Sequence, residues 1–460
     1  MAEAARSPAA RPGVAVVGGG WAGSAAAVTL AAAGIPVTLF EQAKTLGGRA
    51  RRVSFGALAL DNGQHLLIGA YDRTLELLTL VHGADRAQAL FRRLPLTLRP
   101  FGSTSSDEIS LTAWRAPAPL HLVGGILSAR GLDLAERAAL IADFRRLARA
   151  GFRCPSEQTV AECFARTPRR AFDAMWAPLC LAALNTPPQT ASAQVFANVL
   201  RAALAGSARA SELIIPAVDL SACFPEAAAR FIGEHDGAVR VATTVRAVTA
   251  RDGRVLVELA TGDEAFSAAI VAVGPHQLAA TLGDNAERDP AWRAALAQVG
   301  AFAYESITTI YLAFAERVPL AVPLLRLAGG PGQWVFDRSV ALAGESATEA
   351  KSLLAVVISA NGPHDALDHA TLARDAEAQL RQLAPGLRAA TWARVVVEKR
   401  ATYACAPALA RPRHGRITAG VYLAGDYTDP EYPATLEAGV RSGVAAARAL
   451  IADCGAIRAR

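Results

Sequence analysis

The chain contains 460 residues, of which 52% are hydrophobic, and it carries a net charge of +6 at pH 7. A chain of this length exceeds what one hydrophobic core usually supports, so we expect two domains. The 47 Lys and Arg residues are spread along the sequence without a basic run or stripe, which argues against nucleic acid as a partner.

Cysteine usage favours a reducing compartment. No Cys-x-x-Cys spacing occurs, and no histidine accompanies a cysteine at metal-ligand spacing. We therefore expect reduced thiols in a cytoplasmic protein and no metal centre. The six cysteines are Cys154, Cys163, Cys180, Cys223, Cys405 and Cys454.

The N-terminal segment predicts a nucleotide-binding unit. A short apolar strand runs into a Gly-x-Gly-x-x-Gly turn formed by Gly18, Gly20 and Gly23. The first glycine allows the tight turn, the second lets the backbone approach a pyrophosphate, and the third lets helix and strand pack closely. Trp21 and Ala22 begin the following helix, whose free N–H groups and positive dipole end would face the phosphates.

An acidic residue and an arginine follow at informative positions. The second apolar strand, Pro36–Phe40, ends at Glu41, where a carboxylate is expected to accept hydrogen bonds from ribose hydroxyls and to disfavour a 2′-phosphate. Gly48 and Arg49 then form part of a Gly-Gly-Arg sequence. The fixed cation and planar donors of arginine suit a pyrophosphate or the flavin side of FAD.

The C-terminal region contains a predicted second clamp for the same cofactor. An apolar strand, Val421–Leu423, is followed by Gly425 and Asp426, and a helical segment starts near Thr435 and Leu436. A cofactor as long as FAD needs a pyrophosphate cradle and a second contact nearer its reactive ring. Some flavoproteins attach FAD covalently to a cysteine that lies in a glycine-rich segment upstream of the last strand. Cys405 lacks that context, so we expect FAD to be bound without a covalent link.

These motifs resemble those of a known superfamily. The segment Asp61–Tyr71 is similar to the Gly-x-His-x-x-x-Gly-x-Tyr segment of plant-type phytoene and zeta-carotene desaturases, and Leu423–Thr428 is similar to their C-terminal FAD signature. Within the superfamily the chain most resembles the squalene-associated FAD-dependent desaturases, the hydroxysqualene dehydroxylases. Supporting segments are Leu184–Pro188, Ile215–Leu220, Tyr304–Leu312 and Gln333–Arg338.

The resemblance implies an α/β fold in which a Rossmann-type FAD-binding domain is interleaved with a mixed α+β substrate domain. The FAD-binding domain would comprise residues 13–75, 220–275 and 399–460, and the substrate domain residues 76–219 and 276–398, after a flexible tail at 1–12. Residues 76–219 are expected to be largely helical. Gly63 and Gln64 would lie along the flavin, and Val245 would present its backbone to the adenine.

The resemblance also implies the chemistry. Reduced flavin would deliver hydride to an allylic cation, after an acid has protonated the departing hydroxyl of a long-chain isoprenoid substrate. His65 is the first candidate acid, because histidine exchanges protons near neutral pH. Tyr427 is the second, and Asp429, Glu431 and Tyr432 follow in the next loop. Asp61 is expected to order the loop rather than react.

Two other functions fit the same motifs. An oxidative carotene-type desaturase or amine oxidase would share fold and cofactor, because hydride direction depends on the substrate and flavin redox state. A prenyl-binding escort protein would share the architecture without using flavin, although the intact glycines argue against it. The electron donor is not identified by the sequence.

The substrate that the resemblance implies is lipid-soluble and would therefore be found in a membrane. Residues 13–40 carry no charge, yet they contain the phosphate loop, so we expect neither a spanning helix nor a cleaved signal. We expect peripheral association with the inner face of the cytoplasmic membrane, through an apolar patch in residues 95–130.

Overall fold

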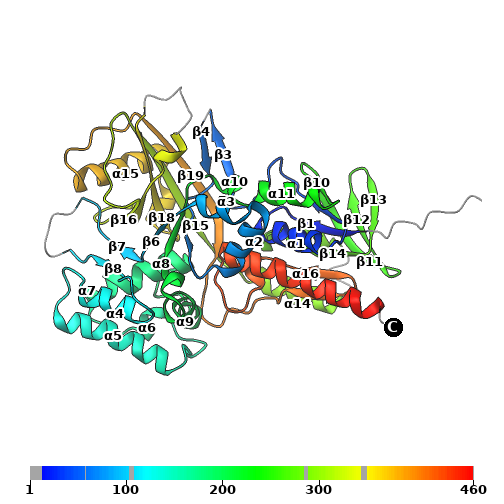
Figure 1. Cartoon of the computed structure of the whole chain (residues 1–460), viewed down its shortest axis with the longest axis horizontal. Helices are drawn as coiled ribbons and strands as arrows, with labels where there is room; N and C mark the ends of the chain where they lie inside the picture. The colour runs from blue at the N-terminus through cyan, green and yellow to red at the C-terminus, as the bar shows by residue number, and fades with distance from the viewer. Residues whose placement is uncertain (1–12, 57, 103–107, 284–288, 343–349, 459–460) are drawn as a thin grey trace, which may run out of the picture.

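The computed structural model describes residues 13–56, 58–102, 108–283, 289–342 and 350–458. The tail expected at residues 1–12 lies outside this range. In Figure 1 a nucleotide-binding half, to the right, adjoins a half built from a second large sheet and a group of helices.

A six-stranded sheet forms the centre of the first half. Its strands run parallel except for the last, which pairs antiparallel with its neighbour. In spatial order they are β10 (Ala238–Arg240), β2 (Val37–Phe40), β1 (Val14–Val17), β14 (Ala268–Val271), β21 (Val421–Leu423) and β20 (Gly415–Thr418). Three distant parts of the chain therefore supply one sheet, and each part falls within a segment predicted for the FAD-binding domain.

Helices and a small sheet complete this half. The helices are α1 (Trp21–Ala32), α2 (Asp72–His82), α3 (Ala84–Ala89), α10 (Leu220–Cys223), α11 (Pro225–Glu234) and α16 (Leu436–Arg458). The small sheet is antiparallel and contains β11 (Val245–Arg251), β12 (Arg254–Leu259) and β13 (Gly262–Phe266). Its first hairpin turns at Asp252 and Gly253, with φ of 51° and 72°, as the Asp-Gly pair predicts.

A five-stranded antiparallel sheet forms the core of the second half. Its strands, in order, are β16 (Leu324–Arg326), β17 (Trp334–Asp337), β18 (Ser352–Ser359), β15 (Tyr304–Phe314) and β19 (Trp392–Tyr403). Side chains alternate between its faces. Ile310, Val335 and Val356 pack on one face in the cluster that includes α15 (His369–Leu383), whereas Trp334 and Val357 face an internal cavity.

The remaining helices and short strands lie outside these three sheets. The helices, of mixed α, π and 3-10 geometry, are α4 (Leu120–Leu127), α5 (Leu134–Arg149), α6 (Val160–Cys163), α7 (Arg169–Ala171), η1 (Phe172–Trp176), α8 (Ala177–Leu184), α9 (Ala193–Leu200), η2 (Arg201–Ala205), η3 (Ala208–Ser211), η4 (Pro275–Gln277), α12 (Leu278–Leu282), α14 (Pro290–Gly300), η5 (Ser339–Leu342), η6 (Pro363–Ala366) and η7 (Asp426–Thr428). The small strands are β3 (Arg52–Phe55), β4 (Leu58–Asp61), β5 (Leu67–Ile68), β6 (Phe91–Leu94), β7 (Thr97–Leu98), β8 (Leu111–Thr112) and β9 (Leu213–Pro216). The prediction that residues 76–219 are largely helical is therefore incomplete, because β6 to β9 lie there as short pairs that lack a long alternating pattern.

Close packing of α16 against α1 brings the two ends of the chain together. A Cβ atom on Gly443 of α16 would lie 2.1 Å from the carbonyl oxygen of Ala22 in α1, and one on Gly23 would lie 1.9 Å from the carbonyl oxygen of Gly18. Both glycines are needed because the neighbouring backbone occupies the space of any larger side chain.

We expect Gly443→Ala to destabilise the protein, because the added methyl group forces α16 away from α1. Overpacking of this kind costs about 1–3 kcal/mol. Gly233→Ala in α11 is the matched control, since its Cβ would meet no atom within 4 Å and alanine favours helix. Urea unfolding followed by circular dichroism measures both; equal stability of the two variants would contradict the packing argument.

Candidate active site

One cavity of about 1040 Å³ extends between the two halves of the molecule. At one end it is bounded by the turn after β1 and the start of α1. At the other it is bounded by apolar side chains of the helices and the five-stranded sheet. That apolar lining comprises Leu66, Leu96, Leu98, Leu179, Ala182, Ala183, Leu213, Ile307, Leu324, Trp334, Phe336 and Val357.

The turn after β1 forms a cradle for a phosphate. Gly18 has φ of 108°, a left-handed conformation that favours glycine, and a Cβ there would lie 2.6 Å from the carbonyl oxygen of Ala272. The N-cap of α1 is Gly20, which offers no side-chain cap to the first N–H groups of the helix. These N–H groups and the positive end of the helix dipole therefore remain available to an anion in the cavity.

Glu41 lies beside this cradle, buried at the end of β2. One carboxylate oxygen accepts a hydrogen bond from the N–H of Gly19 at 2.7 Å, and the other accepts one from the N–H of Ala43 at 2.7 Å. The carboxylate thus holds the phosphate loop and the chain after β2 together. It also lines the cavity, and each of its oxygens keeps a further lone pair that could accept a hydrogen bond from a bound ligand.

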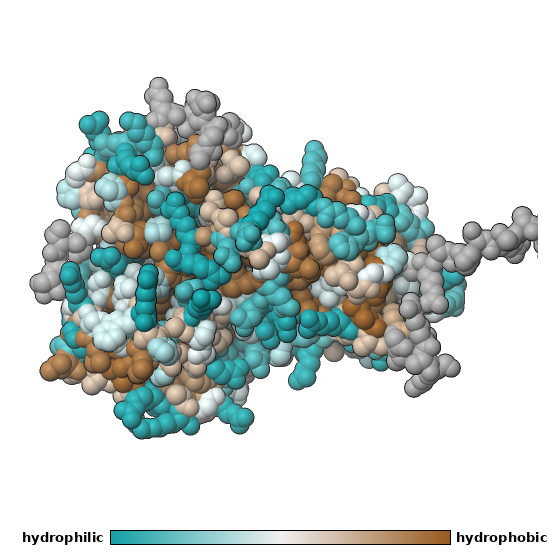
Figure 2. Space-filling model, viewed as in Figure 1, coloured by the Kyte–Doolittle hydropathy of each residue, from teal (hydrophilic) through white to brown (hydrophobic). Residues whose placement is uncertain are grey.

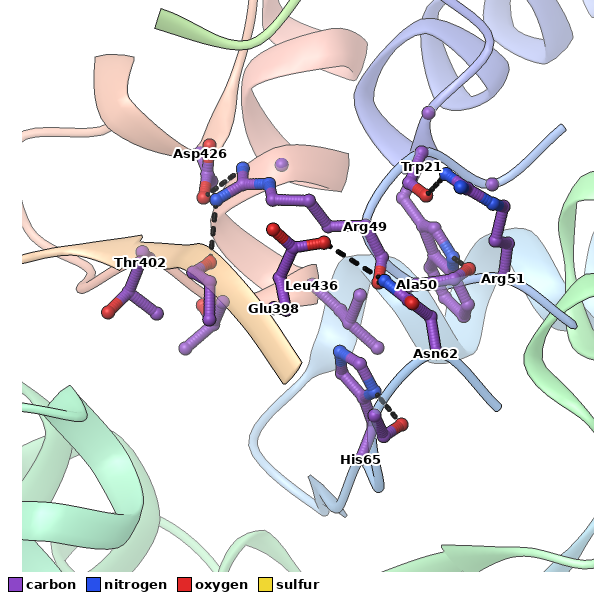
Figure 3. Close-up of a pocket in the computed structure, with 18 of the residues that line it drawn as sticks. Trp21, Arg49, Ala50, Arg51, Asn62, His65, Glu398, Thr402, Asp426 and Leu436 are labelled. Carbon is purple, nitrogen blue, oxygen red and sulfur yellow. Dashed lines mark hydrogen bonds and ion pairs between the residues drawn. The ribbon is translucent and has the colours of Figure 1, made fainter. Parts of the chain in front are cut away.

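The second clamp meets the first across the cavity (Figure 3). Arg49 donates to the carboxylate of Asp426 at 2.7 Å and to the carbonyl oxygen of Ala401 at 2.7 Å. Gly425 has φ of 155°, and its missing side chain leaves room for the Tyr427 ring 2.4 Å from an ideal Cβ. The ion pair joins residues 377 positions apart, so the Gly-Gly-Arg and Gly-Asp motifs form one site.

A second helix N-terminus points at the same cavity. Thr435 and Leu436 line it at the start of α16, and the Thr435 hydroxyl accepts a hydrogen bond from the N–H of Ala438 at 3.2 Å. The positive dipole ends of α1 and α16 therefore converge on one space. Val245 also lines the cavity, at the first residue of β11.

His65 stands between the polar and apolar parts of the cavity. Its Nδ1 lies 2.8 Å from the carbonyl oxygen of Gly63, which can only accept, so Nδ1 carries the proton and Nε2 faces the cavity. Burial lowers the pKa of His65 below its ordinary value, and the charge of Arg49 lowers it further. The ring is therefore mainly neutral at pH 7 and becomes a proton donor from Nε2 only in its minor, protonated form.

The residues present fit a dinucleotide such as FAD. The Oε1 atom of Gln64 is buried at the cavity without a hydrogen-bond partner, which leaves an acceptor for a ligand N–H. A Cβ on Gly20 would meet only the Cα of Gly48, at 4.0 Å, so open space adjoins the cradle. If FAD binds here, Gly20 and α1 would hold its pyrophosphate, and Arg49 and Asp426 would approach its middle.

All residues predicted to bind the cofactor line the cavity except Gly23, and of the two first candidate acids His65 lines it and Tyr427 does not. Gly23 instead packs against the β1 turn, as its motif position predicts. The Tyr427 hydroxyl donates to the carbonyl oxygen of Val273 at 3.3 Å, its ring is fully buried, and burial raises its pKa well above the ordinary value. Tyr427 is therefore not part of the cavity lining, and its proton is held by the backbone carbonyl of Val273, which argues against the expected catalytic role.

The other loop acids also lie outside the cavity lining. Asp429 accepts hydrogen bonds from the N–H groups of Glu431 and Tyr432, and Glu431 pairs with Arg201 at the surface. Asp61 has the ordering role expected of it. Its carboxylate accepts from the N–H of Leu220 at 2.8 Å, and burial raises its pKa to about 6.

Sequence reasoning missed several polar residues that the fold brings to the cavity. Glu398 accepts a hydrogen bond from Asn62 at 3.0 Å, and His276 and Arg400 line the same wall. Asn185, at the left-handed end of α8, donates to Thr402 at 3.0 Å. The only local signal was the unusual run of three charges at 398–400 in an otherwise strand-like segment.

We expect Gly20→Val to fold and yet lose FAD. Its φ of −72° and ψ of −177° suit valine, and no atom lies closer than 4.0 Å to the new Cβ, whereas the branched side chain fills the space beside the cradle. Flavin absorbance after gel filtration measures retention, and thermal unfolding of the apoprotein controls for folding. Stoichiometric flavin in this variant would show that the pyrophosphate lies elsewhere.

Comparisons with known proteins agree with this geometry. Residues 21–451 match the family described as flavin containing amine oxidoreductase. The chain is 29% identical to a hydroxysqualene dehydroxylase of Rhodopseudomonas palustris over 459 residues, covering 95% of this chain and 98% of that protein. It is 26% identical to the hydroxysqualene dehydroxylase of Sinorhizobium fredii, covering 94% and 96%. These similarities confirm the resemblance found in the motifs.

Solved structures show the same fold. A putrescine oxidase variant superposes with a TM-score of 0.70 at 16% identity, covering 96% of this chain and 99% of the other. Cyclohexylamine oxidase from Brevibacterium oxydans superposes with a TM-score of 0.67 at 18% identity, covering 97% and 100%. The interleaved flavoprotein fold predicted from the sequence is thereby confirmed. The chain belongs to the flavin containing amine oxidoreductase family and is an FAD-dependent oxidoreductase.

Proposed function

We propose that this protein converts hydroxysqualene to squalene by reductive dehydroxylation, a step of squalene and hopanoid biosynthesis. In the net reaction the C–O bond breaks, the hydroxyl group leaves as water with one added proton, and a hydride fills the same carbon. Reduced FAD supplies the hydride when it is bound. The relatives at 29% and 26% identity bear the name of this activity over nearly their whole length.

The observation that carries the proposal is the continuity of the cavity. The phosphate cradle and the apolar chamber belong to one space, so a long hydrocarbon in the chamber would reach the ring end of the cofactor. Trp334, Phe336 and Val357 line the chamber from the five-stranded sheet with apolar surface. A dry, apolar wall suits a cationic intermediate that water would otherwise capture.

Few groups on this wall can move a proton. His65 is the titratable side chain placed where the polar and apolar parts meet, with Nε2 directed into the cavity. In its protonated form it would donate from Nε2 to the departing hydroxyl, while Gly63 holds Nδ1. A lowered pKa makes this form scarce at neutral pH but a stronger acid when present.

The direct test is anaerobic incubation of dithionite-reduced, FAD-loaded protein with hydroxysqualene, followed by mass spectrometry of the lipid extract. We expect squalene, with the flavin turning yellow as product forms. In D2O the product should gain deuterium, because the transferable hydrogen of reduced flavin exchanges with solvent. No squalene, together with oxidation of a polyene precursor by the yellow form of the protein, would favour a desaturase instead.

We expect His65→Gln to retain flavin but lose about 100- to 10,000-fold in turnover, since glutamine can form hydrogen bonds but cannot deliver a proton. Tyr427→Phe is the control: it removes only a hydroxyl bound to the Val273 backbone and should keep turnover. Single-turnover flavin oxidation measures both. Normal turnover in His65→Gln would leave the histidine as a structural hydrogen bonder.

The pH profile gives an independent check on the same residue. The imidazolium form of His65 grows as pH falls, and its pKa lies below 6.5, so the dehydroxylation rate should still rise as pH drops from 8 to below 6.5. The slope should vanish in His65→Gln. A rate that falls with acidification over this range would mean that neutral His65 is the working form.

A further inference from the structure

Exposed apolar side chains are concentrated on one surface. Seven large hydrophobic residues are exposed among the described residues, and four of them lie between positions 114 and 134. We call these four the α4 face. They are Trp114, Leu120, Leu127 and Leu134, with exposed fractions of 53%, 60%, 50% and 83%. Figure 2 shows hydrophobic surface at the lower left, where α4 and α5 lie in Figure 1.

The local structure holds these side chains outward. Leu120 and Leu127 are seven residues apart and so share one side of α4. The Trp114 ring lies against Gly124, which has no side chain to displace it, and its indole N–H donates to Ser128 at 2.8 Å. A fixed tryptophan beside exposed leucines is typical of a surface that meets the boundary between lipid and water.

The surface continues into the first turn of α5. Leu134 opens this helix directly after Asp133, which forms a capping box with Glu136. Arg137 ties the two helices together: its guanidinium donates to the carbonyl oxygens of Leu127 and of Ala129, the latter at 2.8 Å. Both leucines therefore stand on one rigid platform.

The same part of the chain concentrates positive charge. Residues 114–173 contain ten arginines and six Asp or Glu residues, so they carry +4 of the net +6 of the whole chain. Arg130, Arg145 and Arg149 are exposed on or beside α5, whereas Glu136 and Asp143 are buried. Exposed leucines flanked by arginines match an anionic lipid surface rather than a neutral one.

This surface is separated from the cavity by a thin wall. Leu96 and Leu98 line the cavity on and just before β7, and β7 pairs with β8 through Leu98 and Leu111. Helix α4 covers β8, since a Cβ on Gly125 would lie 2.9 Å from the carbonyl oxygen of Thr112. A bilayer against the α4 face would thus be separated from the apolar chamber by α4 and one strand pair.

We propose that the α4 face docks this protein on an anionic membrane, with its leucines and Trp114 in the interfacial layer and the arginines of α5 against lipid headgroups. Among the described residues no helix has the length and hydropathy needed to span a bilayer. The idea that this membrane supplies a lipid-soluble substrate to the chamber rests on the proposed function. Docking itself is measured without substrate, so its failure would leave the dehydroxylation untouched, and the reverse also holds.

The test is co-sedimentation of the FAD-loaded full chain with vesicles of phosphatidylglycerol and phosphatidylcholine, and with vesicles of phosphatidylcholine alone. We expect stronger binding to the anionic vesicles and weakening by salt. The double variant Leu127→Gln, Leu134→Glu should reduce partitioning by about tenfold or more, because each leucine loses its apolar burial. Glutamate in the first turn of α5 suits the helix dipole, so folding should be kept.

Leu80→Glu is the matched control, because this leucine is 46% exposed on α2 and the substitution makes the same change in charge. It should bind vesicles like the unchanged protein. A wild-type protein that stays in the supernatant with anionic vesicles would overturn the proposal, as would equal binding by the double variant. So would a dimer seen by light scattering that the double variant abolishes, because the face would then be a protein interface.

Discussion

The close approach of α16 to α1 is the constraint on which the site depends. These helices come from opposite ends of the chain, and Gly443 meets the backbone of Ala22 with no space for a side chain. Because they pack at this distance, both helix N-termini face one cavity and Arg49 reaches Asp426. The ion pair is partly exposed and contributes little stability by itself. The ion pair instead fixes position, because it joins the Gly-Gly-Arg and Gly-Asp segments that form the two halves of the cofactor clamp.

A buried ion pair joins the end of β4 to the residue that follows β17. The carboxylate of Asp61 lies 3.4 Å from the guanidinium of Arg338, both almost fully buried, and Arg338 also donates to the carbonyl oxygen of Pro216 at 2.6 Å. Tyr311 donates to the backbone carbonyl of Asp61 at 3.0 Å. Buried pairs of this kind are costly to desolvate, so they favour one arrangement of their surroundings more than they add stability. Here the ion pair and its hydrogen bonds hold four chain segments, those that contain Asp61, Pro216, Tyr311 and Arg338, in one arrangement.

The cavity sets the electrostatic conditions for the chemistry. On its polar side, two helix N-termini and Arg49 favour negative charge, as a pyrophosphate and an electron-rich flavin require. Burial and the charge of Arg49 lower the pKa of His65, which keeps the imidazole mostly neutral at rest. The chamber beyond His65 is lined by hydrocarbon. One short passage therefore changes from a charged environment to an apolar one, which suits the dehydroxylation proposed above.

Local patterns in the sequence determined the strand–turn–helix of residues 14–32, the acidic end of β2, the Gly-Asp turn and the strands β15 and β18. Glycine conformations and short runs of apolar, β-branched residues are properties of short segments. The tertiary structure alone decided that the Tyr427 hydroxyl meets the carbonyl of Val273, that Glu398 and Asn185 reach the cavity, and that the leucines of α4 stay exposed. Each of these outcomes depends on which distant part of the chain a side chain contacts after folding. The spacing of residues along the chain carries no information about such contacts.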